Sequence, residues 1–172
     1  LTWSGAKLRP VRRLRKVPLC QFQHEARPVI LFGQPEVGTN HYRAFAELTD
    51  VNASDGRRIG LPGEYQTVRC WQASPEQPPV VIMVDRRADL HRLGVDWRPE
   101  TSLKGVGAGA GVLDLDLDGH PELVLSEPVW PGKDDGLQVL SRGEVVWRSR
   151  DVLGGVVAVA GGDPTGAGKI QA

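Results

Sequence analysis

Residues 114–125 read Asp-Leu-Asp-Leu-Asp-Gly-His-Pro-Glu-Leu-Val-Leu, and their order is typical of a loop that wraps a hard cation. Aspartates stand at positions 1, 3 and 5, and Gly119 at position 6 permits a sharp turn. An EF-hand would need a carboxylate at position 12 and a following helix, but position 12 is Leu125. The residues after the turn alternate as they do in a strand. We therefore expect a calcium loop between two β-strands.

The expected metal ligands are four carboxylates and one backbone carbonyl. The carboxylates belong to Asp114, Asp116, Asp118 and Glu122, and the carbonyl to His120 at position 7. Four carboxylates this close together would repel one another without a cation, which favours a bound Ca²⁺. The alternative is an acidic hairpin turn that holds no metal.

The pattern D-x-D-x-D-G-x-x-[DE]-L-x-[VL] resembles the FG-GAP/VCBS repeat, the blade unit of integrin-α-like β-propellers. The matching residues are Asp114, Asp116, Asp118, Gly119, Glu122, Leu123 and Leu125. The resemblance implies that the loop joins the first two strands of a blade and holds a structural calcium ion. Glu122 stands where this family more often has aspartate, which lengthens the arm and keeps the charge.

Composition favours a turn-rich β protein. The 172 residues include 21 Gly and 13 Pro, with only 6% aromatic residues. Lysine plus arginine equals aspartate plus glutamate, 21 each, so no global charge selects nucleic acid or an acidic substrate. No apolar run is long enough to cross a membrane. The chain starts at Leu1 without a signal-like pattern, so we expect a processed protein or a fragment.

The first 24 residues contain several basic side chains and no acidic one. The basic residues are Lys7, Arg9, Arg12, Arg13, Arg15 and Lys16. The segment is either a patch for an anionic partner or a solvated outer strand. It lacks the interleaved aromatic residues that single-stranded nucleic acid would require, so no nucleic-acid partner is expected.

Internal repeats of about 50 residues organise the whole chain. Residues 95–106 match 145–156, with Trp97 opposite Trp147, and the segment after Cys20 resembles that after Cys70. A period near 50 with four short strands per unit predicts an all-β fold, a partial β-propeller. The approximate blades are 1–42, 43–104, 105–152 and an incomplete 153–172. We expect missing blades or a protein partner to cover the open edges.

The sequence predicts four strands for the blade that contains the loop, at 106–113, 122–126, 137–140 and 144–147. Its glycine-rich first strand suits the crowded axis of a propeller, and Trp97 and Trp147 are expected to pack between blades. Two other loops, Asp50–Ile59 and Asp163–Gln171, retain the loop pattern but have lost acidic residues, so we expect no tight cation site there.

Several catalytic patterns are incomplete in the sequence. Residues 162–169 miss a glycine and a hydroxyl of the phosphate-loop motif, and the four histidines form no metal-binding spacing. The cluster formed by Asp85, Arg86, Arg87, Asp89 and His91 is interpreted as a solvated loop of a long hairpin between the third and fourth strands. A role as a binding surface is the alternative.

These observations support two hypotheses of function. The first is a non-catalytic, calcium-stabilised module for protein or glycan binding or assembly, outside the cytoplasm: secreted, periplasmic or on the cell surface. The second is the propeller portion of a secreted polysaccharide lyase or hydrolase. Cys20 and Cys70 are expected to stay unpaired, because equivalent positions on the second strands of successive blades would point the same way around the ring.

Overall fold

The computed structural model describes residues 2–4, 7–9, 17–25, 27–35, 42–48, 57–94, 96–128, 134–149, 156 and 158–161. Every regular element in these ranges is a β-strand, so the predicted all-β class is confirmed. None of the described residues forms a helix long and apolar enough to cross a membrane.

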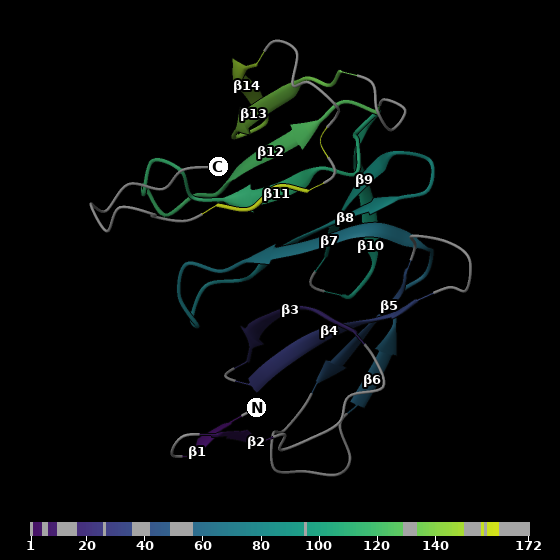
Figure 1. Cartoon of the computed structure of the whole chain (residues 1–172), viewed down its shortest axis with the longest axis vertical. Helices are drawn as coiled ribbons and strands as arrows, with labels where there is room; N and C mark the ends of the chain where they lie inside the picture. The colour runs from purple at the N-terminus through teal and green to yellow at the C-terminus, as the bar shows by residue number, and fades with distance from the viewer. Residues whose placement is uncertain are drawn as a thin grey trace.

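The described strands form a short hairpin, an eight-stranded antiparallel sheet and a four-stranded antiparallel sheet (Figure 1). The eight-stranded sheet consists of two four-stranded units that a single residue pair joins, and these units are called the first and second sheets below. The hairpin is β1 (Thr2–Ser4) and β2 (Lys7–Arg9). The first sheet contains β3 (Val17–His24), β4 (Arg27–Pro35), β5 (Tyr42–Leu48) and β6 (Arg57–Gly60). The second contains β7 (Tyr65–Trp71), β8 (Val80–Asp85), β9 (Asp89–Leu93) and β10 (Pro99–Lys104). The third contains β11 (Ala110–Leu113), β12 (Glu122–Ser126), β13 (Leu137–Ser141) and β14 (Glu144–Arg148).

The third sheet agrees with the strands predicted for the loop-containing blade. Each strand pairs with the next in the order β11-β12-β13-β14, and only β11 is shorter than expected. The turn between β13 and β14 consists of Arg142 and Gly143, with φ angles of 53° and 89°. Two positive φ angles match the twist of a two-residue hairpin, so the Arg-Gly pair fixes this register.

Strand pairing defines where each of the first two sheets ends. The predicted unit border at 42/43 lies at the start of β5, but β5 pairs with β4 over its whole length. The first sheet therefore ends at Gly60, whereas the border at 104/105 coincides with the end of β10. A single residue pair, Tyr42 with Tyr65, links β5 to β7 across the sheet border.

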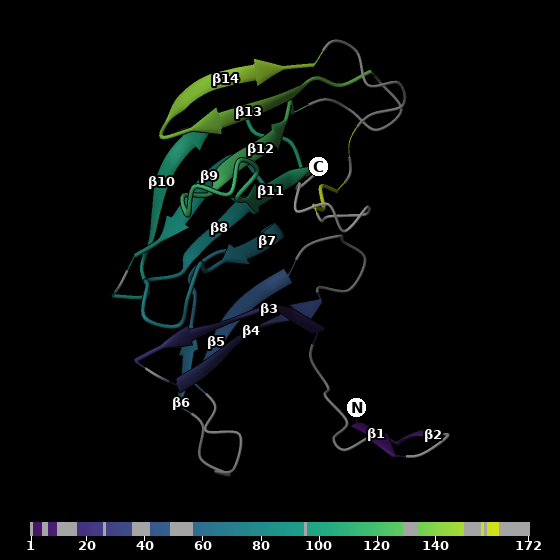
Figure 2. The ribbon, with the colours of Figure 1, turned by 90° about the vertical axis from the view of Figure 1, so that its left-hand side faces the viewer.

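The second sheet is buried on both faces, and β8 shows why. Its residues Val81 and Met83 belong to a core shared with the first sheet, whereas Ile82 and Val84 belong to a core shared with the third. Alternate residues of a strand point to opposite faces, so an uninterrupted apolar run is needed here. Figure 2 shows the three sheets succeeding one another along the long axis.

The first strands of successive sheets lie next to one another: β3 contacts β7, and β7 contacts β11. The Thr67 hydroxyl on β7 donates to the carbonyl of Ala108, just before β11, at 2.6 Å. On the other side of β11, a Cβ at Gly109 would lie only 2.5 Å from Cγ1 of Val156. The glycine row predicted for a crowded innermost strand therefore has a direct reason, because the following segment packs against it.

The two equivalent tryptophans of the repeat differ in their surroundings. Trp97 lies in the turn between β9 and β10, and its ring stacks on Phe22 of the first sheet at a centroid distance of 6.2 Å. It therefore packs between sheets, as predicted. Trp147 on β14 is 52% exposed, so the prediction that it packs between blades is wrong within the described structure. Matched residues thus lie in different elements, one in a turn and one in a strand.

Candidate metal centre

The acidic loop connects β11 to β12, the first two strands of the third sheet, as expected. Leu113 at the end of β11 pairs with Glu122 at the start of β12, so the loop leaves and returns at adjacent backbone positions. Gly119 has a φ of 85°, a conformation in which a side chain would be strained. Leu117 also has a positive φ, of 63°, and its apolar side chain is 55% exposed.

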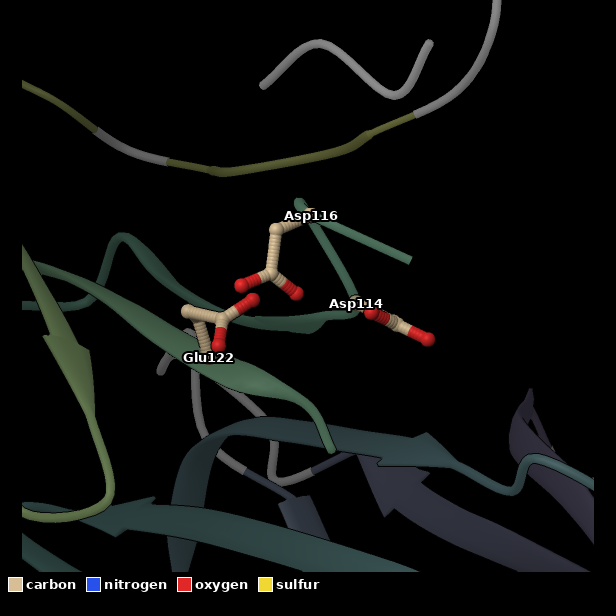
Figure 3. Close-up of side chains that lie close together, drawn as sticks. All are labelled: Asp114, Asp116 and Glu122. Atoms are coloured by element: carbon tan, nitrogen blue, oxygen red, sulfur yellow. The ribbon is translucent and has the colours of Figure 1, made fainter. Parts of the chain in front are cut away.

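Three of the predicted ligands converge. One carboxylate oxygen from each of Asp114, Asp116 and Glu122 can be chosen so that all three lie within 4.8 Å of one another. Figure 3 shows the carboxylates of Asp116 and Glu122 facing one another, with Asp114 beside them at the end of β11. Two oxygens bound to one calcium ion are separated by at most about 5.2 Å, twice the longest usual calcium–oxygen distance. The spacing therefore fits a common cation.

Backbone amides hold the loop in this shape. The carboxylate of Asp114 accepts hydrogen bonds from the N–H groups of Asp118 and Gly119, both at 3.1 Å. The Asp116 carboxylate also accepts from Asp118 N–H, at 3.2 Å. Short acidic side chains form such bonds readily within turns. The loop sequence thus positions its own carboxylates before any cation is considered.

Glu122 is the buried member of the group, with 4% of its surface exposed. One oxygen, Oε2, accepts from the N–H of Leu115 at 2.9 Å, and Oε1 accepts from the Ser141 hydroxyl at 3.0 Å. No cationic side chain pairs with Glu122 in the described part of the chain. A buried carboxylate without a positive partner is costly, and a cation between it and the two aspartates would remove that cost.

The other two predicted ligands are placed differently. The Asp118 carboxylate pairs with the guanidinium of Arg142 in the β13–β14 turn, at 3.0 Å between Oδ2 and Nη2. Its second oxygen accepts from the N–H of His120 at 2.8 Å. Asp118 is therefore outside the converging triad, and His120 is in contact with Asp118 through its backbone nitrogen.

No sequence pattern indicated that Ser141 and Arg142 belong to this centre. Both lie in a hairpin that the sequence identified only as a turn. They reach the loop because β12 pairs with β13, which brings the β13–β14 turn beside the acidic residues. The donor set, with oxygen atoms throughout, suits a hard cation such as Ca²⁺ or Mg²⁺. Such an ion would neutralise the triad and tie β11 to β12.

A second polar site lies at the end of the second sheet where β7 begins and β8 ends. An open cleft of about 540 Å³ has among its lining residues Tyr65, Asp85, Arg86, Arg87, His91 and Thr101. The carboxylate of Asp85 contacts Nε2 of His91 at 3.0 Å, and Nδ1 of the same ring lies 3.2 Å from the Thr101 hydroxyl. The Asp85–Asp89 turn joins β8 to β9, the second and third strands, rather than the third and fourth as predicted.

The environment of this cleft shifts two pKa values. Burial, followed by the Asp85 charge, raises the pKa of Tyr65 to about 12. Burial alone would raise the pKa of Asp85, but hydrogen bonds from the Asp89 amide, His91 and the Arg87 amide together lower it below its ordinary value. Asp85 is thus stabilised as a carboxylate beside His91, and this cluster is more ordered than a solvated loop.

Searches against protein-family models, curated proteins and solved structures find no match to this chain. Of the two degenerate loops, residues 50–56 and 162–172 lie outside the described residues. Ile59 of the first loop lies on β6, where it packs against the core shared by the first two sheets.

Proposed function

We propose that this chain is part of a calcium-stabilised β-propeller that serves as a binding or assembly module outside the cytoplasm. The observation that carries the proposal is the convergence of Asp114, Asp116 and Glu122 on the loop between the first two strands of a four-stranded sheet. Calcium is favoured because the loop offers alternate carboxylates followed by glycine, and because Ca²⁺ accepts irregular oxygen shells. Asp118 would join the shell by exchanging its Arg142 contact for the ion.

The repeated arrangement of the sheets supports a propeller. Three antiparallel four-stranded units follow one another in the described chain, and their first strands are in contact. A ring of blades has this arrangement, with each first strand nearest the axis. Resemblance of residues 114–125 to the FG-GAP/VCBS repeat supports the same proposal. Further blades or a protein partner would complete the ring.

The cleft at the end of the second sheet, beside the β8–β9 turn, is the proposed ligand site. Its volume of about 540 Å³ suits a small polar group such as a sugar unit, and its lining combines two carboxylates with two guanidinium groups. Arg86 pairs with Glu64 at 2.7 Å, whereas Arg87 forms no ion pair within the described residues. A glycan or a polar protein loop would find both donors and acceptors here.

Calorimetric titration of the chelator-treated chain tests the metal part of the proposal. We expect one calcium site, and an affinity at least about tenfold weaker in Asp116→Asn, because a ligand charge is lost. Asp134→Asn, at an exposed aspartate outside the loop, is the matched control and should bind calcium as the unaltered chain does. Absence of calcium binding, or equal affinities of the two variants, would contradict the assignment.

A secreted polysaccharide-acting enzyme is the second candidate. The hydrogen-bonded series Asp85, His91 and Thr101 at the edge of the cleft favours it, since a carboxylate-oriented histidine can move a proton. A glycan panel probed for both binding and chain cleavage separates the two functions. Binding without cleavage supports the module, and cleavage that is lost in His91→Gln supports the enzyme.

A further inference from the structure

The two cysteines of the chain lie on the first strands of neighbouring sheets, where both are half-buried free thiols. Cys20 is on β3 and Cys70 on β7, not on second strands as predicted. Both side chains pack against the hydrophobic core that the first two sheets share. The repeat thus places them at equivalent positions on strands that contact each other.

The two cysteines are neighbours across the contact between β3 and β7. The sulfur of Cys70 lies 3.5 Å from the backbone oxygen of Gln21, the residue next to Cys20. The Cys70 thiol is also the largest cause of the raised pKa of the Cys20 thiol.

The neighbouring Gln72 fixes the register of the two strands. Its side-chain oxygen accepts from the N–H of Gln23 at 2.7 Å, and its nitrogen donates to the oxygen of Gln23 at 2.8 Å. These two bonds imitate strand pairing between β3 and β7, three residues after Cys20 and two residues after Cys70. They hold the two strands in register close to both thiols, and a disulfide requires such proximity.

We propose that Cys20 and Cys70 form a reversible disulfide that cross-links the first and second sheets. A low-molecular-weight disulfide such as glutathione disulfide is the oxidant. One of the two protein thiolates attacks one sulfur of that disulfide and releases one glutathione thiolate, which takes up a proton. The other protein thiol, after losing its proton to solvent, attacks the protein sulfur of the mixed disulfide and releases the second glutathione as a thiolate, which also takes up a proton. Two protein thiols and one glutathione disulfide thereby become one protein disulfide and two glutathione thiols.

Once formed, the bond closes a long loop between two sheets. We expect the oxidised chain to melt about 5–10 °C higher than the reduced chain.

The test uses the full chain, reduced and then equilibrated in glutathione buffers of increasing oxidising strength. Free thiols are alkylated and the intact mass is measured. We expect both alkylation sites to be lost together, a mass about 2 Da lower, no glutathione adduct, and the higher melting temperature. Retained thiols, glutathione adducts at the most oxidising ratio, or disulfide-linked dimers would each overturn the proposal.

Two single variants test the roles of the cysteines. In Cys20→Ser and in Cys70→Ser the remaining thiol should accumulate a glutathione adduct that nothing resolves, with no gain in melting temperature. A gain in melting temperature in either single variant under oxidising conditions would overturn the proposal. Since the mass measurement on the unaltered chain needs neither variant, the cross-link is testable even if one of them fails to fold.

Discussion

We expect Glu122→Gln to stabilise the chain without calcium and to destabilise it when calcium is added. Without a cation, the Glu122 carboxylate is buried and faces two further carboxylates whose oxygens lie within 4.8 Å. At an effective dielectric constant of about 20, each such pair repels by about 3 kcal/mol before screening. Asp116 is exposed and strongly screened, so we expect Glu122→Gln to gain about 1 kcal/mol in the presence of a chelator.

Geometry should survive this substitution. The glutamine oxygen can accept from the Leu115 amide as the carboxylate does, and its amide nitrogen can donate to the Ser141 hydroxyl oxygen. With calcium at about one hundred times its dissociation constant, the unaltered chain gains about 2.7 kcal/mol from binding. The variant loses most of that gain, so it becomes the less stable protein by about 1–2 kcal/mol.

Urea unfolding followed by tryptophan fluorescence measures both states, once with chelator and once with calcium. Glu144→Gln is the matched control, because Glu144 is an exposed glutamate on β14 of the same sheet. It should leave the calcium-dependent gain in stability unchanged. If Glu122→Gln has the same effect on the free energy of unfolding in both buffers, Glu122 binds no calcium and the reasoning fails.

Two further substitutions test the packing of the sheets and the charged cleft. Gly109→Ala should lower the free energy of unfolding by about 3 kcal/mol, because the added Cβ would lie 2.5 Å from Val156 Cγ1. Val156→Ala in the same chain should recover part of this loss in urea unfolding. A double variant as unstable as Gly109→Ala alone would contradict the contact. Asp85→Asn should destabilise the chain at neutral pH and progressively less as the pH falls below about 4. The pKa of Asp85 is lower in the folded chain than in the unfolded chain, so its carboxylate stabilises the fold at pH values above the unfolded-state pKa. This contribution is lost as the pH falls through the folded-state pKa. A difference in unfolding free energy that does not change with pH would contradict the role of the Asp85 charge.

Local chemistry made the third sheet predictable from the sequence. Strand β12 was predicted with its observed bounds, since alternation begins directly after the glycine turn and ends before the Glu127-Pro128 pair. Gly143 marked the β13–β14 hairpin, and Gly119 marked the acidic loop. Each of these signals lies within a few residues of the structure that it determines, so no long-range pairing was needed to recognise it.

Features that depend on strand pairing could not be predicted in the same way. The repeat offset aligned Trp97 with Trp147, although one lies in a turn and the other on an edge strand. The offset of 50 matches β3 to β7, but it does not match β10 to β14, because loop lengths differ between the second and third sheets. The part that Ser141 and Arg142 play in the candidate metal centre depends on the pairing of β12 with β13. No residue near them in the sequence indicates that pairing.

The relation between successive first strands favours a ring over a sandwich. Gln72 binds Gln23 between β3 and β7, and Thr67 binds the Ala108 carbonyl between β7 and β11. The described segment 158–161 then approaches β11, where a Cβ at Gly111 would lie 2.8 Å from Cγ1 of Val159. A two-layer sandwich needs only one such contact, because its second sheet can be solvated on the outside. Here the second sheet is covered on both faces, and the third sheet receives the next segment on the face opposite to the second. A structure that adds each unit in the same way continues until it closes or meets a partner, which is the behaviour expected of propeller blades.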